Sequence, residues 1–283
     1  ATESKVYIVD RLGNYVENYP VDLSAYRVSG MTVLDYDKSK NYRFLIADDR
    51  GNLCLMNKEG VLLEGWNPKK IEGRLANKPF HLRIRGKDVI VAIQEDGIVN
   101  LMNRRGEMMP GFPLDTKGRI SGDTFVNRGG NLSKTSLVVI SDIGKLTEFN
   151  LTGETLKSDQ FYRPSSLTKF ALIDDALGKS YIISRQDGNK LVLLNEQKDE
   201  ILAKDYLSDE ALKIQFYNFS VENKVYVATD ETQGFSYVYN TDGILVNSRP
   251  FDSDFEIAMT FSESRKQYKI YAVSDKSVKL LSF

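Results

Sequence analysis

Short runs of alternating apolar and polar residues recur along the chain, and each ends in Asn or Asp followed by a turn. The runs are VYIVDRLG at 6–13, LCLMNKEG at 53–60, VNLMNRRG at 99–106, LTEFNLTG at 146–153, LVLLNEQK at 191–198 and YVYNTDG at 237–243. Their anchor residues are Asp10, Asn57, Asn103, Asn150, Asn195 and Asn240, with spacings of 47, 46, 47, 45 and 45 residues. The chain is therefore built from a repeat of about 46 residues.

The chemistry of each anchor predicts a hairpin turn. Asn and Asp bond their own backbone two residues on, and a Gly three residues later supplies a positive φ without steric cost. The alternating run before the anchor indicates one strand and the run after it another.

Two further strands precede each of these runs, and a second turn, such as DDRG at 48–51 or DIG at 142–144, separates the second strand from the run. No stretch keeps a helical period, and SDEALKI at 208–214 comes nearest. Four short antiparallel strands in about 46 residues are typical of a propeller blade. We predict an all-β fold, a β-propeller of six four-stranded blades, with seven as the alternative, in a single domain over residues 1–283.

The strands predicted at the two ends of the chain together make up one four-stranded blade. Residues 254–283 supply three strands, and residues 13–20 supply an outer strand without a blade of its own. We expect these N- and C-terminal strands to pair and close the propeller, which would remove open sheet edges. Residues 5–10 are then left over, either from an upstream blade or as part of a seventh.

Charge and composition exclude several classes of function. The formal net charge is −1, with 38 Lys and Arg against 39 Asp and Glu, which argues against nucleic acid as the main partner. The single histidine, His81, and single cysteine, Cys54, leave little for a transition-metal site or a catalytic triad. No apolar stretch approaches the length of a membrane span. We expect no metal, no cofactor and no catalytic residue.

The repeats resemble quinoprotein-like and WD40-like propellers in the broad sense. The segments KVYIVDRLGNYVENYPVDL at 5–23 and VLDYDKSKNYRFLIADDRGNLCLMNKEG at 33–60 look like the C-terminal propeller of large envelope proteins of Gram-negative bacteria. The resemblance implies a domain excised from a longer protein and a location in the periplasm or cell envelope. The chain departs from quinone-binding propellers in having one tryptophan, Trp66, so no cofactor is carried over.

Two chemical alternatives come from the acidic residues. The segment Asp35–Asn41 has oxygen ligands at alternate positions, but an EF-hand loop needs Gly and Glu where Lys40 and Ile46 stand, so polar Asx turns are favoured over calcium. A glycan-binding protein or a glycan-directed hydrolase or lyase using the axial funnel stays open. Three or more converging carboxylates and an arginine there would favour the enzyme.

The loops that enter the repeats are basic early in the chain, and the turns between the second and third strands are acidic. In a propeller both lie on one face, and mixed charge with aromatic residues suits a protein interface. We therefore expect a non-catalytic scaffold or recognition module that binds another protein or an envelope component through this face. The candidate residues are Tyr26, Arg27, Lys69, Lys70, Arg74, Lys117, Arg119, Tyr162 and Arg163.

Overall fold

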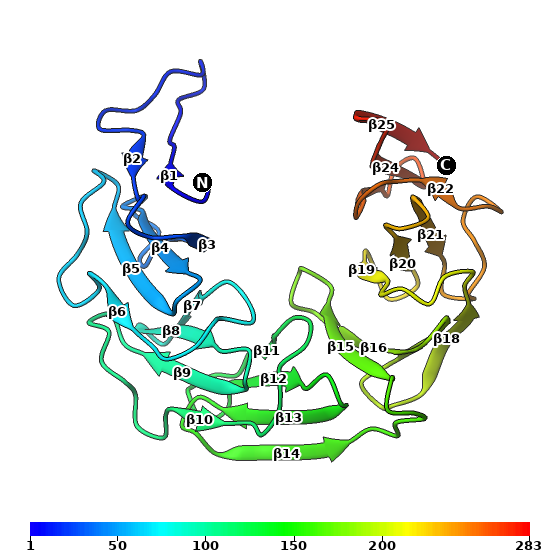
Figure 1. The fold of residues 1–283 in the computed structure, drawn as a ribbon, viewed down its shortest axis with the longest axis horizontal. Helices are drawn as coiled ribbons and strands as arrows, with labels where there is room; N and C mark the ends of the chain where they lie inside the picture. The colour runs from blue at the N-terminus through cyan, green and yellow to red at the C-terminus, as the bar shows by residue number, and fades with distance from the viewer. The chain divides into compact units, whose positions relative to one another are not determined.

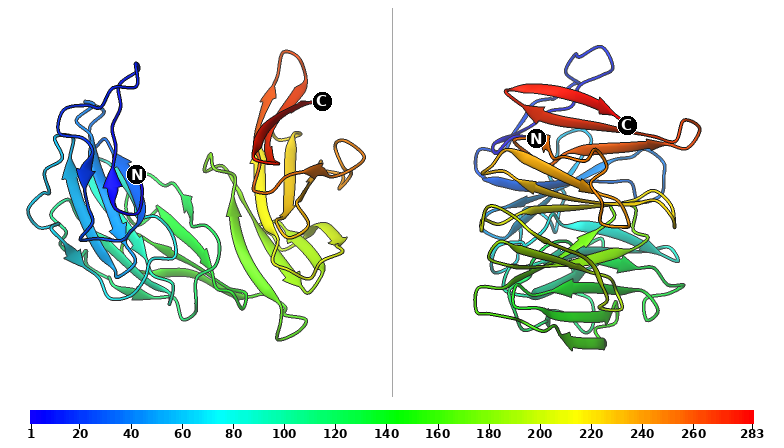
Figure 2. Two further views of the ribbon diagram at one scale, coloured as in Figure 1. Left: turned by 45° about the horizontal axis from the view of Figure 1, so that its top comes forward. Right: turned by 90° about the vertical axis from the view of Figure 1, so that its right-hand side faces the viewer.

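The computed structural model describes all residues 1–283 as an all-β chain of 25 strands in seven sheets (Figure 1). It contains no helix, as the sequence predicted, and so no helix long and apolar enough to cross a membrane. The first sheet pairs β1 (Lys5–Val6) with β2 (Val21–Asp22). The segment between them, dark blue in Figures 1 and 2, extends as a loop.

Five sheets have four strands each, in which neighbours in sequence are neighbours in space. They are β3 (Val28–Leu34), β4 (Arg43–Asp48), β5 (Asn52–Asn57) and β6 (Lys69–Lys70); β7 (Phe80–Ile84), β8 (Lys87–Ile93), β9 (Ile98–Met102) and β10 (Leu114–Asp115); β11 (Phe125–Asn127), β12 (Ser136–Ile140), β13 (Lys145–Asn150) and β14 (Thr155–Gln160); β15 (Lys169–Asp174), β16 (Tyr181–Asp187), β17 (Lys190–Leu194) and β18 (Glu200–Asp205); and β19 (Lys213–Asn218), β20 (Lys224–Asp230), β21 (Phe235–Tyr239) and β22 (Phe251–Asp252).

The last sheet has three strands, β23 (Ala258–Ser262), β24 (Gln267–Ser274) and β25 (Ser277–Ser282). The total of seven sheets fits the alternative count of seven blades rather than six. Residues 5–10, left over in the sequence-based count, belong to the additional small sheet through Lys5 and Val6.

The predicted hydrogen-bonded closure by the terminal strands is not formed. Residues 13–20 contain no strand, and their one bridge joins Tyr15 to Val9 within the same loop. Strand β25 pairs with β24 alone. The physical reason on the N-terminal side is local, because the residues on both sides of the Asp10 turn pair with each other: Asp10 N–H donates to Asn14 O at 2.8 Å and Val16 N–H donates to Ile8 O at 3.0 Å.

All six predicted anchors form the same turn. The side-chain oxygen of each accepts the N–H groups two and four residues on, at 2.8–3.1 Å. The residue three positions on has positive φ in every case, including Lys198, which stands where the other five turns have Gly. The repeat read from the sequence is therefore a repeat of backbone geometry.

By its contacts the chain divides into two compact units. Unit 1 comprises residues 1–121, 127–138 and 147–158, and unit 2 comprises residues 122–126, 139–146 and 159–283. The prediction of a single domain stays a prediction. In unit 1, apolar side chains of β4 and β5 pack on one side against Val6, Tyr19 and Leu23, and on the other against Ile90, Ala92 and Met102. In unit 2, equivalent layers lie between successive sheets from β15 to β25.

An aromatic residue at the end of an outer segment joins one sheet to the next. The Trp66 indole is fully buried and donates to the carbonyl of Arg104 at 2.8 Å, in the anchor turn of the following sheet. Tyr19 makes the same contact one repeat earlier, donating to Lys58 O at 3.1 Å. At these two places the sheet is thus held to its neighbour by a bond to the turn that the anchor shapes.

Candidate functional site

The loops that lead into each sheet pack on the turns between the second and third strands, as the sequence predicted. The Ile71 N–H donates to Gly51 O at 2.9 Å, Thr116 N–H to Gly97 O at 3.1 Å and Phe161 N–H to Gly144 O at 2.8 Å. Because backbone bonds fix the two kinds of loop together, their basic and acidic side chains share one surface.

In unit 1 this surface carries a row of alternating charges, which we call the arginine–carboxylate rim: Arg27, Asp49, Arg74, Glu95 and Arg119. The Arg27 guanidinium lies 3.6 Å from the Asp49 carboxylate. Glu95 holds two arginines, with Arg74 Nε at 3.9 Å from one carboxylate oxygen and Arg119 at 3.2 Å from the other. A cavity of about 360 Å³ is lined by Arg27, Asp49 and Arg74.

The rim arginines remain open to solvent. The exposed fractions of the Arg27, Arg74 and Arg119 side chains are 68%, 68% and 67%. Exposed ion pairs of this kind contribute at most about 1 kcal/mol each, because water screens them. The guanidinium groups can therefore exchange their present carboxylates for those of a ligand at little cost.

Of the three candidate lysines, two lie beside the rim and the third pairs with a carboxylate of its own loop. Lys69 and Lys70 form β6, pair with Leu53 and Asn52, and border a cavity of about 470 Å³ that Asp96 also lines. The Lys117 ammonium is 2.5 Å from the Asp115 carboxylate of its own loop. Lys117, with a side chain 70% exposed, thus pairs with its own loop rather than with a rim carboxylate.

The remaining three candidates have different roles. Tyr26 is half-buried in the apolar cluster beneath β1 and β2, and burial raises the pKa of its phenol. In unit 2, Tyr162 is 75% exposed, whereas the Arg163 guanidinium donates to the carbonyls of Ser166 and Thr168 and so stabilises its own loop. Tyr26 and Arg163 therefore also contribute to the fold.

Glu95, the residue to which both Arg74 and Arg119 bind, was missed in the sequence. It lies in one of the acidic turns between a second and a third strand, here between β8 and β9, and is not among the candidate residues that the sequence singles out. The signal was available in its position, because the residue at the start of that turn faces the incoming loop: Glu95 N–H donates to Arg74 O at 2.8 Å.

A second polar cluster surrounds Asp88, whose side chain is only 3% exposed. His81 Nε2 lies 2.8 Å from it, Arg83 lies 3.0 Å away and Arg104 Nε lies 2.6 Å away. The Arg104 guanidinium also stacks on the Tyr36 ring at 4.2 Å. Burial lowers the pKa of His81 despite its bond to Asp88. Asp88 therefore has three partners among these side chains, and His81 is held between Asp88 and the Tyr36 ring.

The acidic segment 35–41 forms backbone turns. The Asp35 carboxylate accepts the N–H of Lys40 at 3.1 Å, and Asp37 accepts the Ser39 hydroxyl at 2.6 Å. Across the chain, no three His, Cys, Asp or Glu side chains gather closely enough to hold a metal ion. These carboxylates fit the Asx-turn interpretation.

In unit 2, carboxylates gather near the first strands of the sheets. Asp123 accepts the N–H of Asp174 at 3.2 Å. Burial, with the charges of Asp174 and Glu256, raises the pKa of Asp123 to about 6. These are three of the groups that the glycan-directed alternative requires, but none of the groups that shift Asp123 is an arginine.

Comparisons with known proteins support the fold. No family model matches the chain, and no curated protein matches it. Among solved structures, BamB from Moraxella catarrhalis is similar over 100% of this chain and 92% of its own, with a TM-score of 0.53 and 11% identity. BBS1N, solved in complex with ARL6DN, is similar over 99% of this chain and 84% of its own, with a TM-score of 0.55 and 12% identity. The all-β fold of this chain is a β-propeller.

Proposed function

We propose that this chain is a non-catalytic recognition module that binds another protein through the arginine–carboxylate rim. The observation that carries the proposal is the sharing of Glu95 between Arg74 and Arg119 on an exposed surface. Such a row offers a partner both donors and acceptors at fixed spacing, and arginine is enriched in protein interfaces because its planar guanidinium pairs with carboxylates bidentately. The fold adds support, since BBS1N was solved in complex with ARL6DN.

The absence of catalysis is part of the proposal, and two side chains support it. Cys54 is buried, and burial raises the pKa of its thiol, which disfavours the reactive thiolate. His81 is held between Asp88 and the Tyr36 ring. The only cysteine and the only histidine are thus both occupied in the fold. A polysaccharide-cleaving activity that disappears in Asp123→Asn would refute this part.

We also propose a location in the periplasm or cell envelope, supported by the resemblance of residues 5–23 and 33–60 to envelope propellers. Fractionation of the source cells tests it, and recovery of the protein in the cytosol would contradict it.

The binding proposal is tested by photo-crosslinking in source cells, with a crosslinking residue at Ser29, which lines the rim cavity. The Arg74→Glu/Arg119→Glu double variant should abolish the crosslinked adduct. The matched control is Arg11→Glu/Arg105→Glu, which makes the same charge change at two exposed residues of the anchor turns. Equal adduct yields in the two double variants would overturn the rim as the binding surface.

A further inference from the structure

A cavity of about 280 Å³ lies at the end of unit 1 opposite the arginine–carboxylate rim. It is lined by Arg85 and Lys87 from the turn between β7 and β8, by Asn131 and Ser133 from the loop between β11 and β12, and by Thr152 from the next anchor turn. In antiparallel four-stranded sheets these turns share one end, whereas the rim is built at the other. Both sheets lie in the middle of the chain, with further sheets before and after them.

The cavity contains two cations and no carboxylate. Arg85 and Lys87 line it, and neither side chain makes a hydrogen bond or an ion pair in the structure. The adjacent carboxylate, Asp88, is buried and already contacts one histidine and two arginines. Two positive charges therefore stay uncompensated beside the cavity.

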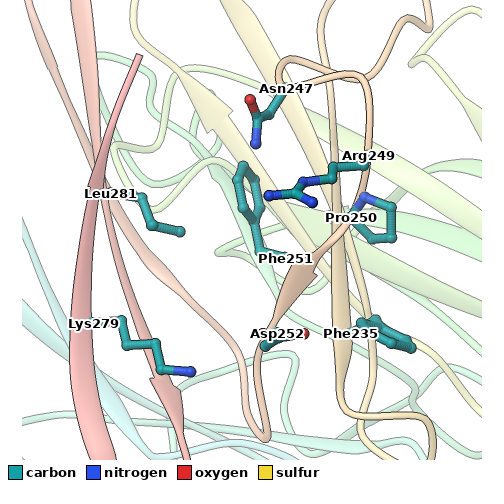
Figure 3. A pocket seen from close by; sticks show the side chains of 8 residues that line it. All are labelled: Phe235, Asn247, Arg249, Pro250, Phe251, Asp252, Lys279 and Leu281. Atoms are coloured by element: carbon teal, nitrogen blue, oxygen red, sulfur yellow. The ribbon is translucent and has the colours of Figure 1, made fainter.

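Three other cavities of the protein have basic residues together with a carboxylate. Asp49 lines the rim cavity, and Asp96 lines the cavity beside β6. Asp252 lines a groove of about 370 Å³ between β25 and the segment that leads into β22 (Figure 3). Of these four cavities, the one between β7 and the loop after β11 is alone in offering positive charge without an acidic residue.

The loop between β11 and β12 adds uncharged donors. The Asn131 side-chain oxygen accepts the Ser133 hydroxyl at 2.9 Å, while the NH₂ group of the same amide has no partner. The backbone N–H groups of residues 131–133 also donate to no acceptor. The Arg85 guanidinium lies beside this loop, since a Cβ at Gly130 would be 3.7 Å from its Nη2 atom. Charged and neutral donors are thus brought together at the cavity.

Arg85 stands at a turn position that the backbone does not favour for arginine. Ile84 and Lys87 pair across β7 and β8, so Arg85 and Gly86 form a two-residue hairpin turn. Both have positive φ, +48° and +80°, a geometry in which Asn, Asp or Gly is preferred at the first position. The guanidinium makes no hydrogen bond or ion pair that would offset this strain, which points to a role outside the fold.

We propose that this cavity binds the phosphate group of a small phosphate monoester. Such a group carries a charge of about −1.5 to −2 at pH 7, which matches two cations, and it has three oxygens that accept charge-assisted hydrogen bonds. Arg85 and Lys87 bind these oxygens, with the Asn131 amide as a neutral donor. Ile84 and Leu132 supply an apolar wall for the organic part of the ester. The volume of about 280 Å³ suits a compact ligand, since typical ligand pockets span about 300–1,000 Å³.

The first test measures binding of phenyl phosphate to the full chain by isothermal titration calorimetry at neutral pH. Phenyl sulfate has nearly the same shape but a single charge, and it should bind about tenfold more weakly. Inorganic phosphate lacks the apolar group and should bind about fivefold more weakly. Equal binding of phenyl sulfate would show that the second charge is not recognised, and equal binding of inorganic phosphate that no organic group is held. Either result overturns the proposal.

Substitutions separate binding from folding. Lys87→Gln and Arg85→Asn should each weaken phenyl phosphate binding by about tenfold, the size of one charge-assisted hydrogen bond. Arg85→Asn should at the same time keep or raise the unfolding midpoint, because asparagine favours this turn. The matched control is Arg105→Gln, an exposed anchor-turn residue whose carbonyl lies against Gly65 of the preceding sheet. Equal losses in the control would mean that the whole basic surface attracts the anion, and unchanged binding in both cavity variants would mean that neither cation holds it; each outcome refutes the site.

Amide NMR locates the bound phosphate. The backbone signals of residues 130–133 and the side-chain NH₂ signal of Asn131 should shift as phenyl phosphate is added, whereas those of Arg74 and Glu95 should not. Shifts confined to the arginine–carboxylate rim would place the anion on the rim arginines and overturn the assignment to this cavity.

Discussion

A single side-chain oxygen organises each anchor turn, and its importance depends on how deeply the turn is buried. Asn150 is 1% exposed, and its oxygen accepts the N–H groups of Thr152 and Glu154, both at 3.0 Å. Its amide also donates to Ser133 O and to the Glu154 carboxylate. Asn240 makes the same two bonds to backbone N–H groups in a more open turn.

We predict that Asn150→Ala lowers the free energy of unfolding by about 2–4 kcal/mol, because several polar groups lose partners where water cannot replace them. Asn240→Ala should cost about 1 kcal/mol, since water reaches the freed N–H groups. Urea titrations of both variants measure the difference. Equal losses would show that burial of the turn is not what matters.

Asp123 gives a pH-dependent prediction. Its pKa in the folded protein is raised from 3.8 to about 6, chiefly by burial. A raised pKa means that the folded state favours the protonated carboxyl, so ionisation destabilises the fold as pH rises from about 4 through 6. Asp123→Asn keeps an acceptor for Asp174 N–H and removes the charge.

The Asn variant should therefore match the wild type at pH 4 and exceed its stability at pH 8 by up to about 3 kcal/mol. Unfolding midpoints at the two pH values measure this. A stability gain in the variant that is the same at both pH values would contradict a titration of Asp123.

At the scale of elements, the glycines show where one sheet approaches the next. Gly13 and Gly111 both have a φ of +86°. A Cβ at Gly13 would meet no atom within 4 Å, but one at Gly111 would lie 2.4 Å from Thr152 O in the following anchor turn. An alanine substitution at each of these two glycines therefore distinguishes the cost of backbone strain from the cost of steric overlap.

Gly13→Ala should cost about 1 kcal/mol, the price of a left-handed conformation for a residue with a Cβ. Gly111→Ala should cost about 2–4 kcal/mol, since the backbone of the neighbouring sheet must also move. Thermal and urea unfolding of the two variants measure the gap. Similar losses of stability in the two variants would mean that neighbouring sheets can shift relative to each other at little cost.

The elements could be predicted because their signals are local. Asn and Asp anchors at a constant spacing identify turns through bonds that span four residues, and Val, Ile and aromatic runs identify the buried strands between them. Whether a segment with a strand-like pattern forms a strand depends on whether a neighbouring segment pairs with it. Residues 14–19 have a strand-like pattern, but Tyr15 bridges to Val9 and leaves the segment a loop.

The candidate site could be predicted only in part for the same reason. The sequence placed Arg27, Arg74 and Arg119 in loops of one face, which needs only the strand order. Glu95 binds two of these arginines, whereas Lys117 binds Asp115. Which of these pairs forms depends on where each side chain points, and the pairs with Glu95 join loops that are far apart in the chain. Composition carries no information on those directions.

At the scale of the molecule, the N-terminal residues cover a face of the first four-stranded sheet. Val6 and Tyr19 are 0% and 7% exposed and pack with Phe44, Ile46 and Met56. Glu3 and Ser4 contribute too, since their carbonyls accept the N–H groups of Val28 and Leu23 at 2.9 and 2.7 Å. Ala1 and Thr2 make no backbone bond of this kind to a distant residue.

Removal of residues 1–20 should therefore lower the melting temperature by several degrees or more, or drive the protein to aggregate. It uncovers the apolar face of β4 and β5, and burial of each large side chain there contributes about 1.5–3 kcal/mol. Removal of residues 1–2 should shift the melting temperature by less than about 1 °C, within the range of surface changes. Calorimetry and light scattering of the two truncations measure both outcomes. A long truncation that stays monomeric with an unchanged melting point would mean that this layer adds nothing to stability, and that the sheet β3–β6 can end the fold by itself.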